Sequence, residues 1–156
     1  MSQTKTHSII ESLTNTTIKP RLYLVGAYTG TPAQTRKNIA TARKYAEKLW
    51  AQGYAVFCPH LNSSLMEETT EVNYQDFLDG YLEWIRCADV VYLLPNHKRS
   101  NGSLVEIELC KKLNIPLCKT MGELIEWKKG WDHIKDWGVL RRIFNRVTEW
   151  RGKRYE

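Results

Sequence analysis

One short segment of the sequence combines hydroxyl groups, a glycine and a carboxylate. Residues 100–106 have the sequence SNGSLVE and lie between a predicted buried strand and a predicted helix. The first N–H groups of a helix lack backbone partners and carry partial positive charge, so this turn suits a phosphate. Lys98 and Arg99 precede it and add positive charge. The candidate ligand-binding residues in the turn are Ser100, Asn101, Gly102 and Ser103.

Glu106 lies one turn into the same predicted helix, and two roles compete for its carboxylate. A carboxylate over the strand ends could attack a sugar C1′ as its N-glycosidic bond breaks, because that transition state resembles an oxocarbenium ion. The run from Ser103 to Glu106 also matches a capping box, in which Glu106 would only satisfy the N-cap amide. The spacing alone favours the capping role, since short motifs often match by chance.

A second loop, residues 26–30 with the sequence GAYTG, is predicted at the same edge of the sheet. Gly26 ends a buried strand, and Tyr28 offers a ring that can stack on a base and a hydroxyl that can form a hydrogen bond. An ordinary strand-to-helix turn with an exposed aromatic side chain is the alternative. Both residues are therefore candidates for binding a substrate.

The two loops are positioned by strands and helices that alternate along the chain. The hydrophobic pattern predicts strands at 21–26, 54–57, 89–94 and 115–118, and helices at 36–53, 74–87, 103–113 and 121–127. Short connections and right-handed crossovers then give an α/β fold with an open, doubly wound parallel sheet. Ligands in such sheets bind outside the carboxyl ends of the strands. The polar segment 61–73 is long enough to cover that site as a flexible flap.

The 156 residues suit one domain, which we place at 21–126, with a flexible arm at 1–20 and a tail at 127–156. The tail holds nine Lys/Arg and four Asp/Glu, so 9 − 4 = +5 of the chain's net +6 lies there, together with four of six tryptophans. Apolar residues at helical spacing favour an amphipathic helix that packs on the domain or on a partner subunit. Nucleic-acid binding, with arginines on phosphates and tryptophans stacked on bases, is the less favoured alternative.

Other functional classes find little support in the sequence. No apolar run approaches the roughly 18 residues of a membrane span, and the N-terminus does not resemble a signal peptide. The four cysteines are scattered, and the histidines lack metal-ligand spacing. We therefore expect a cytoplasmic protein with free thiols, no metal and no membrane partner.

Two stretches of the sequence resemble nucleoside 2-deoxyribosyltransferase-like proteins. Residues 23–30, YLVGAYTG, are similar to the opening of that family, and residues 87–106 are similar to its second half through CADVV and the later S-x-G-S-x-x-E. The similarity covers residues 21–118. It implies a flavodoxin-like, Rossmann-like fold without a cofactor, often as a homo-oligomer. The implied reaction is transfer of deoxyribose between bases, or hydrolysis of the N-glycosidic bond of deoxynucleotides.

The resemblance also implies roles for individual residues. Glu106 matches the nucleophilic glutamate of the family, which reverses the preference for a capping role, and Tyr28 falls in the pocket region. Six residues before this glutamate, the nucleotide hydrolases carry Ser and the nucleoside transferases carry Asp. Ser100 occupies that position here. A hydroxyl beside positive charge accepts a phosphate that a carboxylate would repel, so a nucleoside monophosphate is the expected substrate.

One family position differs. An Asp that helps to protonate the leaving base is usual eight residues before the Asp that opens the third strand, here Asp89. Tyr81 occupies that position, with Asp79 two residues away, and a tyrosine is a poor acid at neutral pH. We take Asp79 and Tyr81 as candidates to assist the base, and Asp89 as a further substrate-binding candidate. A nucleotide-binding protein of the same fold without catalysis is the alternative function.

Overall fold

The computed structural model describes residues 19–68 and 71–132 of the 156-residue chain. Most of the expected N-terminal arm and residues 133–156 of the expected tail lie outside the described residues. The predictions of a tail helix and of a nucleic-acid surface fall mainly on that part of the chain. The expected domain, by contrast, is described except for residues 69 and 70.

The four predicted strands form one parallel sheet, which confirms the doubly wound α/β fold. The sheet has the order β2-β1-β3-β4, the order of the first four strands in flavodoxin-like sheets. The strands are β1 (Arg21–Val25), β2 (Ala55–Phe57), β3 (Val90–Leu93) and β4 (Leu117–Cys118). β1 pairs with β2 on one side and with β3 on the other, so the chain reverses direction across the sheet at β1. The loops after β1 and β3 separate at that point and leave room for a ligand.

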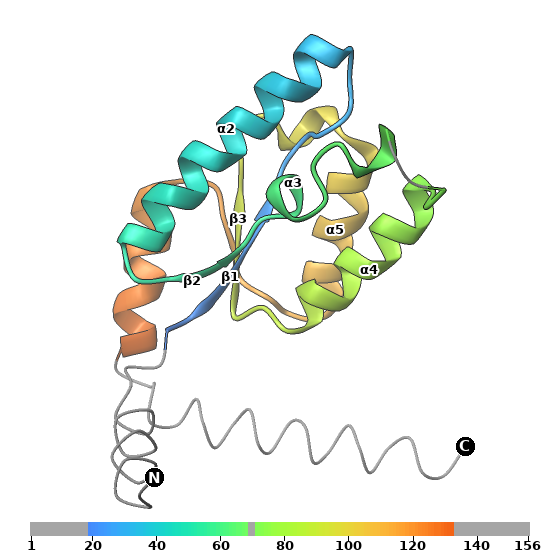
Figure 1. The fold of residues 1–156 in the computed structure, drawn as a ribbon. Coiled ribbons are helices and arrows are strands. Elements are labelled where there is room, and N and C mark those ends of the chain that lie inside the picture. The colour runs from blue at the N-terminus through green and yellow to red at the C-terminus, as the bar shows by residue number, and fades with distance from the viewer. Residues whose placement is uncertain (1–18, 69–70, 133–156) are drawn as a thin grey trace, which may run out of the picture.

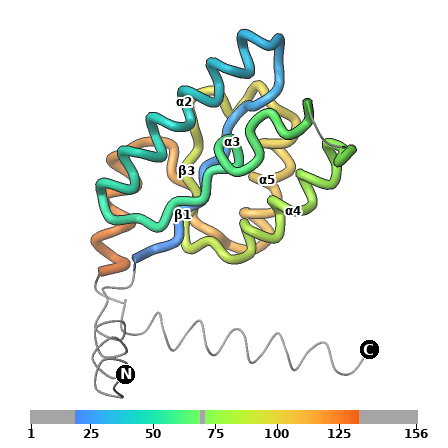
Figure 2. The backbone as a smooth tube through the Cα atoms, in the orientation of Figure 1, coloured from blue at the N-terminus to red at the C-terminus, as the bar shows by residue number. Residues whose placement is uncertain are grey.

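Helices cover both faces of the sheet (Figure 1). α2 (Pro32–Ala51) and a helix over residues 121–132 lie on one face, and α4 (Tyr74–Arg86) and α5 (Asn101–Lys112) lie side by side on the other (Figure 2). Successive side chains of a strand point to opposite faces, and β1 follows this rule. Leu22 and Leu24 pack in the cluster that includes α2, whereas Tyr23 and Val25 pack with α4 and α5.

The start of α5 differs from the sequence prediction and removes the proposed capping box. The helix begins at Asn101 instead of Ser103, and Ser100 is its N-cap. The Ser100 Oγ accepts a hydrogen bond from the backbone N–H of Ser103 at 3.3 Å. The capping role of Glu106 is therefore wrong, because Glu106 lies beyond the first turn and its carboxylate is bound elsewhere.

Two other elements extend past their expected limits. α2 begins at Pro32, four residues early, because Thr31 caps it and proline suits a first helical position. The last described helix runs through residue 132 and crosses the expected boundary at 126. Its Trp127 packs against the sheet core and stacks on Trp131 with ring centroids 5.6 Å apart. None of the described helices is long and apolar enough to span a membrane.

The expected flap has regular structure in part. The expected segment 61–73 begins within α3 (Pro59–Asn62) and contains a short 3-10 helix, η1 (Met66–Glu68). Cys58 and Pro59 follow directly on β2, so this segment starts at the same carboxyl edge of the sheet as the loops after β1 and β3. Three separate segments therefore converge there.

Candidate functional site

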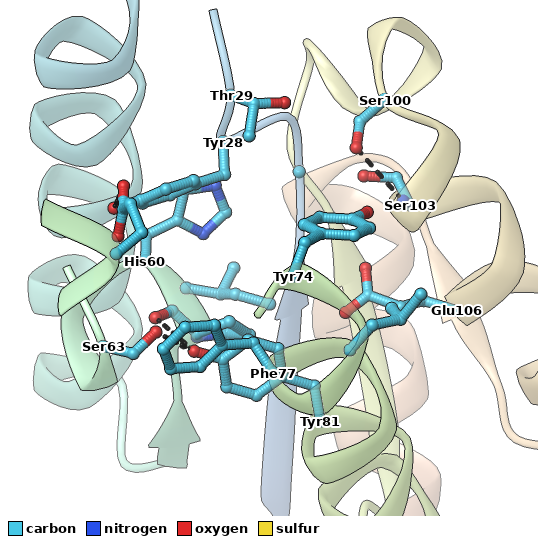
Figure 3. A pocket seen from close by; sticks show the side chains of 15 residues that line it. Tyr28, Thr29, His60, Ser63, Tyr74, Phe77, Tyr81, Ser100, Ser103 and Glu106 are labelled. Carbon is cyan, nitrogen blue, oxygen red and sulfur yellow. Dashed lines mark hydrogen bonds between the residues drawn. The ribbon is translucent and has the colours of Figure 1, made fainter. Parts of the chain in front are cut away.

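A cavity of about 230 Å³ opens at the carboxyl edge of the sheet, on the α4 and α5 side (Figure 3). The loop after β1, the segment 59–67, α4 and the start of α5 supply its walls. Six of the residues predicted from the sequence line it: Gly26, Tyr28, Tyr81, Ser100, Ser103 and Glu106. The other lining residues are Leu24, Thr29, Pro59, His60, Ser63, Glu67, Tyr74, Phe77 and Leu78.

Glu106 presents a buried carboxyl group to this cavity. The side chain is only 7% exposed, and the Tyr23 hydroxyl donates a 2.6 Å hydrogen bond to its Oε1. Burial raises the pKa of Glu106 to about 7, and the hydrogen bond from Tyr23 partly opposes that rise. A carboxyl group with a near-neutral pKa in a cavity is a candidate nucleophile or proton carrier.

The first turn of α5 supplies hydroxyl groups on the same wall as Glu106 (Figure 3). Ser103 is 1% exposed, and its Oγ has no hydrogen-bond partner among the described residues. Asn101 and Gly102 belong to this turn but do not line the cavity. A Cβ at Gly102 would collide with the hydroxyl of Tyr74, so glycine allows that ring to lie against the turn. No acidic side chain occupies the first turn, which leaves its positive end free for an anion.

Tyr28 and His60 form the opposite wall (Figure 3). Their rings meet edge to face with centroids 5.8 Å apart. The Tyr28 hydroxyl donates to Glu67 Oε1 and accepts from the backbone N–H of Leu65, both at 2.8 Å. Burial raises the pKa of Tyr28 to about 12, so the hydroxyl stays protonated and links the loop after β1 to the segment around η1.

Buried polar groups hold the backbone of the loop that carries Tyr28. His60 Nε2 donates to the carbonyl of Ala27 at 3.0 Å, and burial lowers the pKa of His60, so the ring is neutral. The Asn96 Oδ1 accepts from the N–H of Ala27 at 3.3 Å, and the Asn38 Nδ2 donates to the carbonyl of Tyr28 at 2.9 Å. These contacts fix Tyr28 relative to the sheet.

Tyr81 lines the cavity at the position that the resemblance assigns to an acid. Its hydroxyl contacts the Ser63 hydroxyl and lies 3.5 Å from the carbonyl of Pro59. Burial raises the pKa of Tyr81, so it does not act as an acid at neutral pH.

Two acidic residues predicted for the site lie elsewhere. Asp79 is exposed on α4 and accepts a 2.7 Å hydrogen bond from Gln75, because the helix turns its side chain away from Tyr81 and the cavity. Asp89 precedes β3 at the amino edge of the sheet, opposite the cavity. Its carboxylate accepts from the Arg21 guanidinium at 2.8 Å and 3.1 Å and from the Arg21 N–H at 2.8 Å. These placements do not fit roles in contact with a substrate in this cavity.

Several lining residues escaped the sequence analysis. Tyr23 does not line the cavity but binds Glu106 from a buried strand, where only its polar hydroxyl could have indicated a partner. Glu67 lies in the segment 61–73 that was expected to cover the site, and His60 directly precedes that segment, but polar residues without periodicity do not indicate which way their side chains point. Among the described residues, no group of three or more His, Cys, Asp or Glu side chains is arranged to hold a metal ion.

Comparisons with known proteins identify a family without assigning an activity. The family model described as Domain of unknown function (DUF4406) matches residues 20–119. A search of curated proteins finds no match to this sequence. The matched residues contain all four strands of the sheet and every residue that lines the cavity.

Proposed function

The chain belongs to the family described as Domain of unknown function (DUF4406), and from the site within its matched residues we propose that the protein breaks the N-glycosidic bond of a nucleoside monophosphate. Glu106 acts as the nucleophile. One observation carries the proposal: a buried carboxyl group, held by the Tyr23 hydroxyl, faces a cavity whose wall includes the positive end of α5 and the Ser103 hydroxyl, which has no partner among the described residues. The resemblance to nucleoside 2-deoxyribosyltransferase-like proteins agrees with this assignment.

The chemistry follows from the position of the carboxylate. In its ionised form Glu106 attacks C1′ of the sugar, and the electrons of the C1′–N bond leave with the base. A pKa of about 7 keeps a large share of Glu106 ionised at neutral pH while preserving its basicity. The hydrogen bond from Tyr23 fixes one carboxylate oxygen, so the other is the attacking atom.

The start of α5 supports a phosphate on the substrate. The Ser100 and Ser103 hydroxyls lie on the cavity wall next to Glu106, at the positive end of the α5 dipole. Lys98 and Arg99 immediately precede this turn and are exposed. An uncharged nucleoside would leave this positive end unused, so a monophosphate is the better ligand.

Aromatic side chains support a planar base in the remaining space. Tyr28, Phe77 and Tyr81 line the cavity, and the last two rings stack with centroids 6.5 Å apart. Stacking of a base on aromatic rings contributes about 1–3 kcal/mol and tolerates different bases. The walls therefore agree with a nucleobase as the leaving group.

Incubation with a panel of ribo- and deoxyribonucleoside monophosphates, followed by chromatography, tests the proposal. We expect free base from at least one monophosphate and far less from the matching nucleoside. Glu106→Gln should abolish release. Glu108→Gln is the matched control, because Glu108 lies on the same helix but is exposed, and its ion pair within the described residues is with Lys111. Release that persists in Glu106→Gln, or no release from any nucleotide, would contradict the proposal.

A second candidate function is nucleotide binding without cleavage. The observation in its favour is the absence of Asp79 from the cavity and the presence of Tyr81 where the resemblance implies an acid. This alternative predicts that a monophosphate raises the melting temperature of the protein and is recovered intact.

If cleavage is observed, addition of a second free base to the assay separates hydrolysis from transfer, because transfer yields a new nucleotide.

A further inference from the structure

On the basis of the proposed function, we infer that Glu67 is the residue that donates a proton to the leaving base and then removes one from the attacking water. The position that the resemblance gives to this role holds Tyr81, and Asp79 lies outside the cavity. Glu67 lines the cavity from η1, at a position to which the resemblance assigned no role.

Elimination within the cavity leads to Glu67. Among the described residues that line the cavity, Glu67 and Glu106 are the two with carboxyl groups. Glu106 is required as the nucleophile. Burial raises the pKa values of Tyr28 and Tyr81, and the low pKa of buried His60 leaves it neutral, with its Nε2–H committed to Ala27. None of these three side chains is suited to give up a proton at neutral pH.

The position of Glu67 suits the role. Its Oε1 is held by the Tyr28 hydroxyl, and Tyr28 forms the wall across the cavity from Ser103 and Glu106 (Figure 3). Within the described residues this is its one hydrogen bond, so Oε2 is free to exchange a proton. Tyr28 also binds the N–H of Leu65, whose φ of 61° is rare for a residue other than glycine. Leu65 immediately precedes η1, so Tyr28 contacts both the backbone before η1 and the Glu67 carboxylate within it.

The two steps balance with the groups present. In the first, Glu106 bonds to C1′, the C1′–N bond breaks with its electron pair going to the base, and the proton of Glu67 passes to that nitrogen. In the second, a water oxygen bonds to C1′, its proton passes to the Glu67 carboxylate, and the C1′–O bond to Glu106 breaks. The products are the free base and the sugar phosphate, with both glutamates restored.

Glu67→Gln, assayed on two substrates, tests the inference. An ordinary monophosphate needs a proton on its leaving base, whereas a 7-methylguanine nucleotide already carries a cationic base that leaves without one. We expect the variant to lose about 10²–10⁴-fold on the ordinary substrate. On the methylated substrate the variant should release a rapid burst of base, after which turnover should stall. Peptide mass spectrometry should then detect sugar phosphate covalently bound to Glu106. Azide should restore turnover of Glu67→Gln, with a glycosyl azide as the product. Glu67→Asp should keep part of the activity.

Glu68→Gln is the matched control, because Glu68 is the next residue of η1, is exposed and does not line the cavity. Equal losses on both substrates, or no burst and no effect of azide, would overturn the inference and leave Glu67 a residue that merely holds Tyr28. The wild-type protein separates the two ideas. If it cleaves and depends on Glu106 while Glu67→Gln cleaves both substrates normally, only the role of Glu67 fails. If it cleaves nothing, the proposed function itself fails.

Discussion

At the scale of single residues, two opposing effects set the pKa of Glu106. Removal from water disfavours its charged form, and the hydrogen bond from Tyr23 favours that form. Burial is the larger effect, so the pKa stays near neutrality instead of near its ordinary value of 4.5. The same balance controls how activity and stability depend on pH.

We expect kcat/KM of the wild-type protein to fall below about pH 7, tenfold per pH unit, because the nucleophile must be ionised. Tyr23→Phe removes the hydrogen bond that lowers the pKa of Glu106, so the acidic limb should move to higher pH by about one unit. The pH profile of base release measures the shift.

Tyr54→Phe is the control for this profile. Tyr54 is equally buried, but its hydroxyl donates to the carbonyl of Leu124 on the other face of the sheet. Its variant should lose some stability and keep the wild-type limb. If the acidic limb of the pH profile does not shift in Tyr23→Phe, the limb does not reflect ionisation of Glu106.

The raised pKa of Glu106 also predicts a pH-dependent penalty to stability. Between pH 4.5 and about 7, unfolding ionises Glu106, which favours the unfolded chain, so stability falls as pH rises through this interval. At about 1.4 kcal/mol per pH unit the whole effect is limited to about 3 kcal/mol. Urea unfolding should show that Glu106→Gln gains roughly 2–3 kcal/mol over the wild type between pH 5 and pH 8. A constant difference between the two proteins would contradict the buried, partly neutral carboxyl group.

At the scale of elements, periodicity predicted every strand of the sheet and located the long helices, but it misplaced the starts of α2 and α5. The reason at α5 is that two serines compete as N-cap, and only backbone geometry decides between them. Ser100 has an extended backbone (φ −133°, ψ 123°), and Asn101 already continues into the helix. This choice moves Glu106 out of the first turn and into the cavity. The chemistry of the site thus depended on a boundary that spacing alone could not fix.

Two helical glycines, Gly80 in α4 and Gly102 in α5, have different surroundings, and alanine substitutions should separate their roles. Gly80 is exposed within α4, and a Cβ there meets nothing within 4 Å. Gly80→Ala should therefore stabilise the protein by about 1 kcal/mol without changing KM. In Gly102→Ala the new methyl group displaces Tyr74 from the start of α5, so KM for a monophosphate should rise several-fold. Thermal melting and steady-state kinetics of the pair measure both effects, and a raised KM in Gly80→Ala would contradict this division.

At the scale of the whole molecule, the wall that faces Glu106 was the least predictable part of the site. The α5 wall follows from sequence because a strand, a turn and a helix are each marked by pattern. The opposite wall comes from residues 59–67, whose direction is set by the contacts of Tyr28 and by the buried His60. These contacts join residues 33 to 39 positions apart in the sequence, so no local pattern indicates them.

The two edges of the sheet have different roles: contacts at the amino edge stabilise the fold, and the carboxyl edge carries the candidate site. Substitution of Asp89 tests this difference. At the amino edge its carboxylate ties β3 to β1 through three hydrogen bonds with Arg21, whereas the cavity lies at the carboxyl edge. Asp89→Asn keeps the shape but loses the charge-assisted contacts, so we expect a loss of about 1–3 kcal/mol. Base release measured well below the melting temperature should be unchanged. Asp79→Asn, which touches only the exposed Gln75 contact, should alter neither property. A lower kcat/KM at an unchanged melting temperature in Asp89→Asn would instead indicate that Asp89 contacts the substrate.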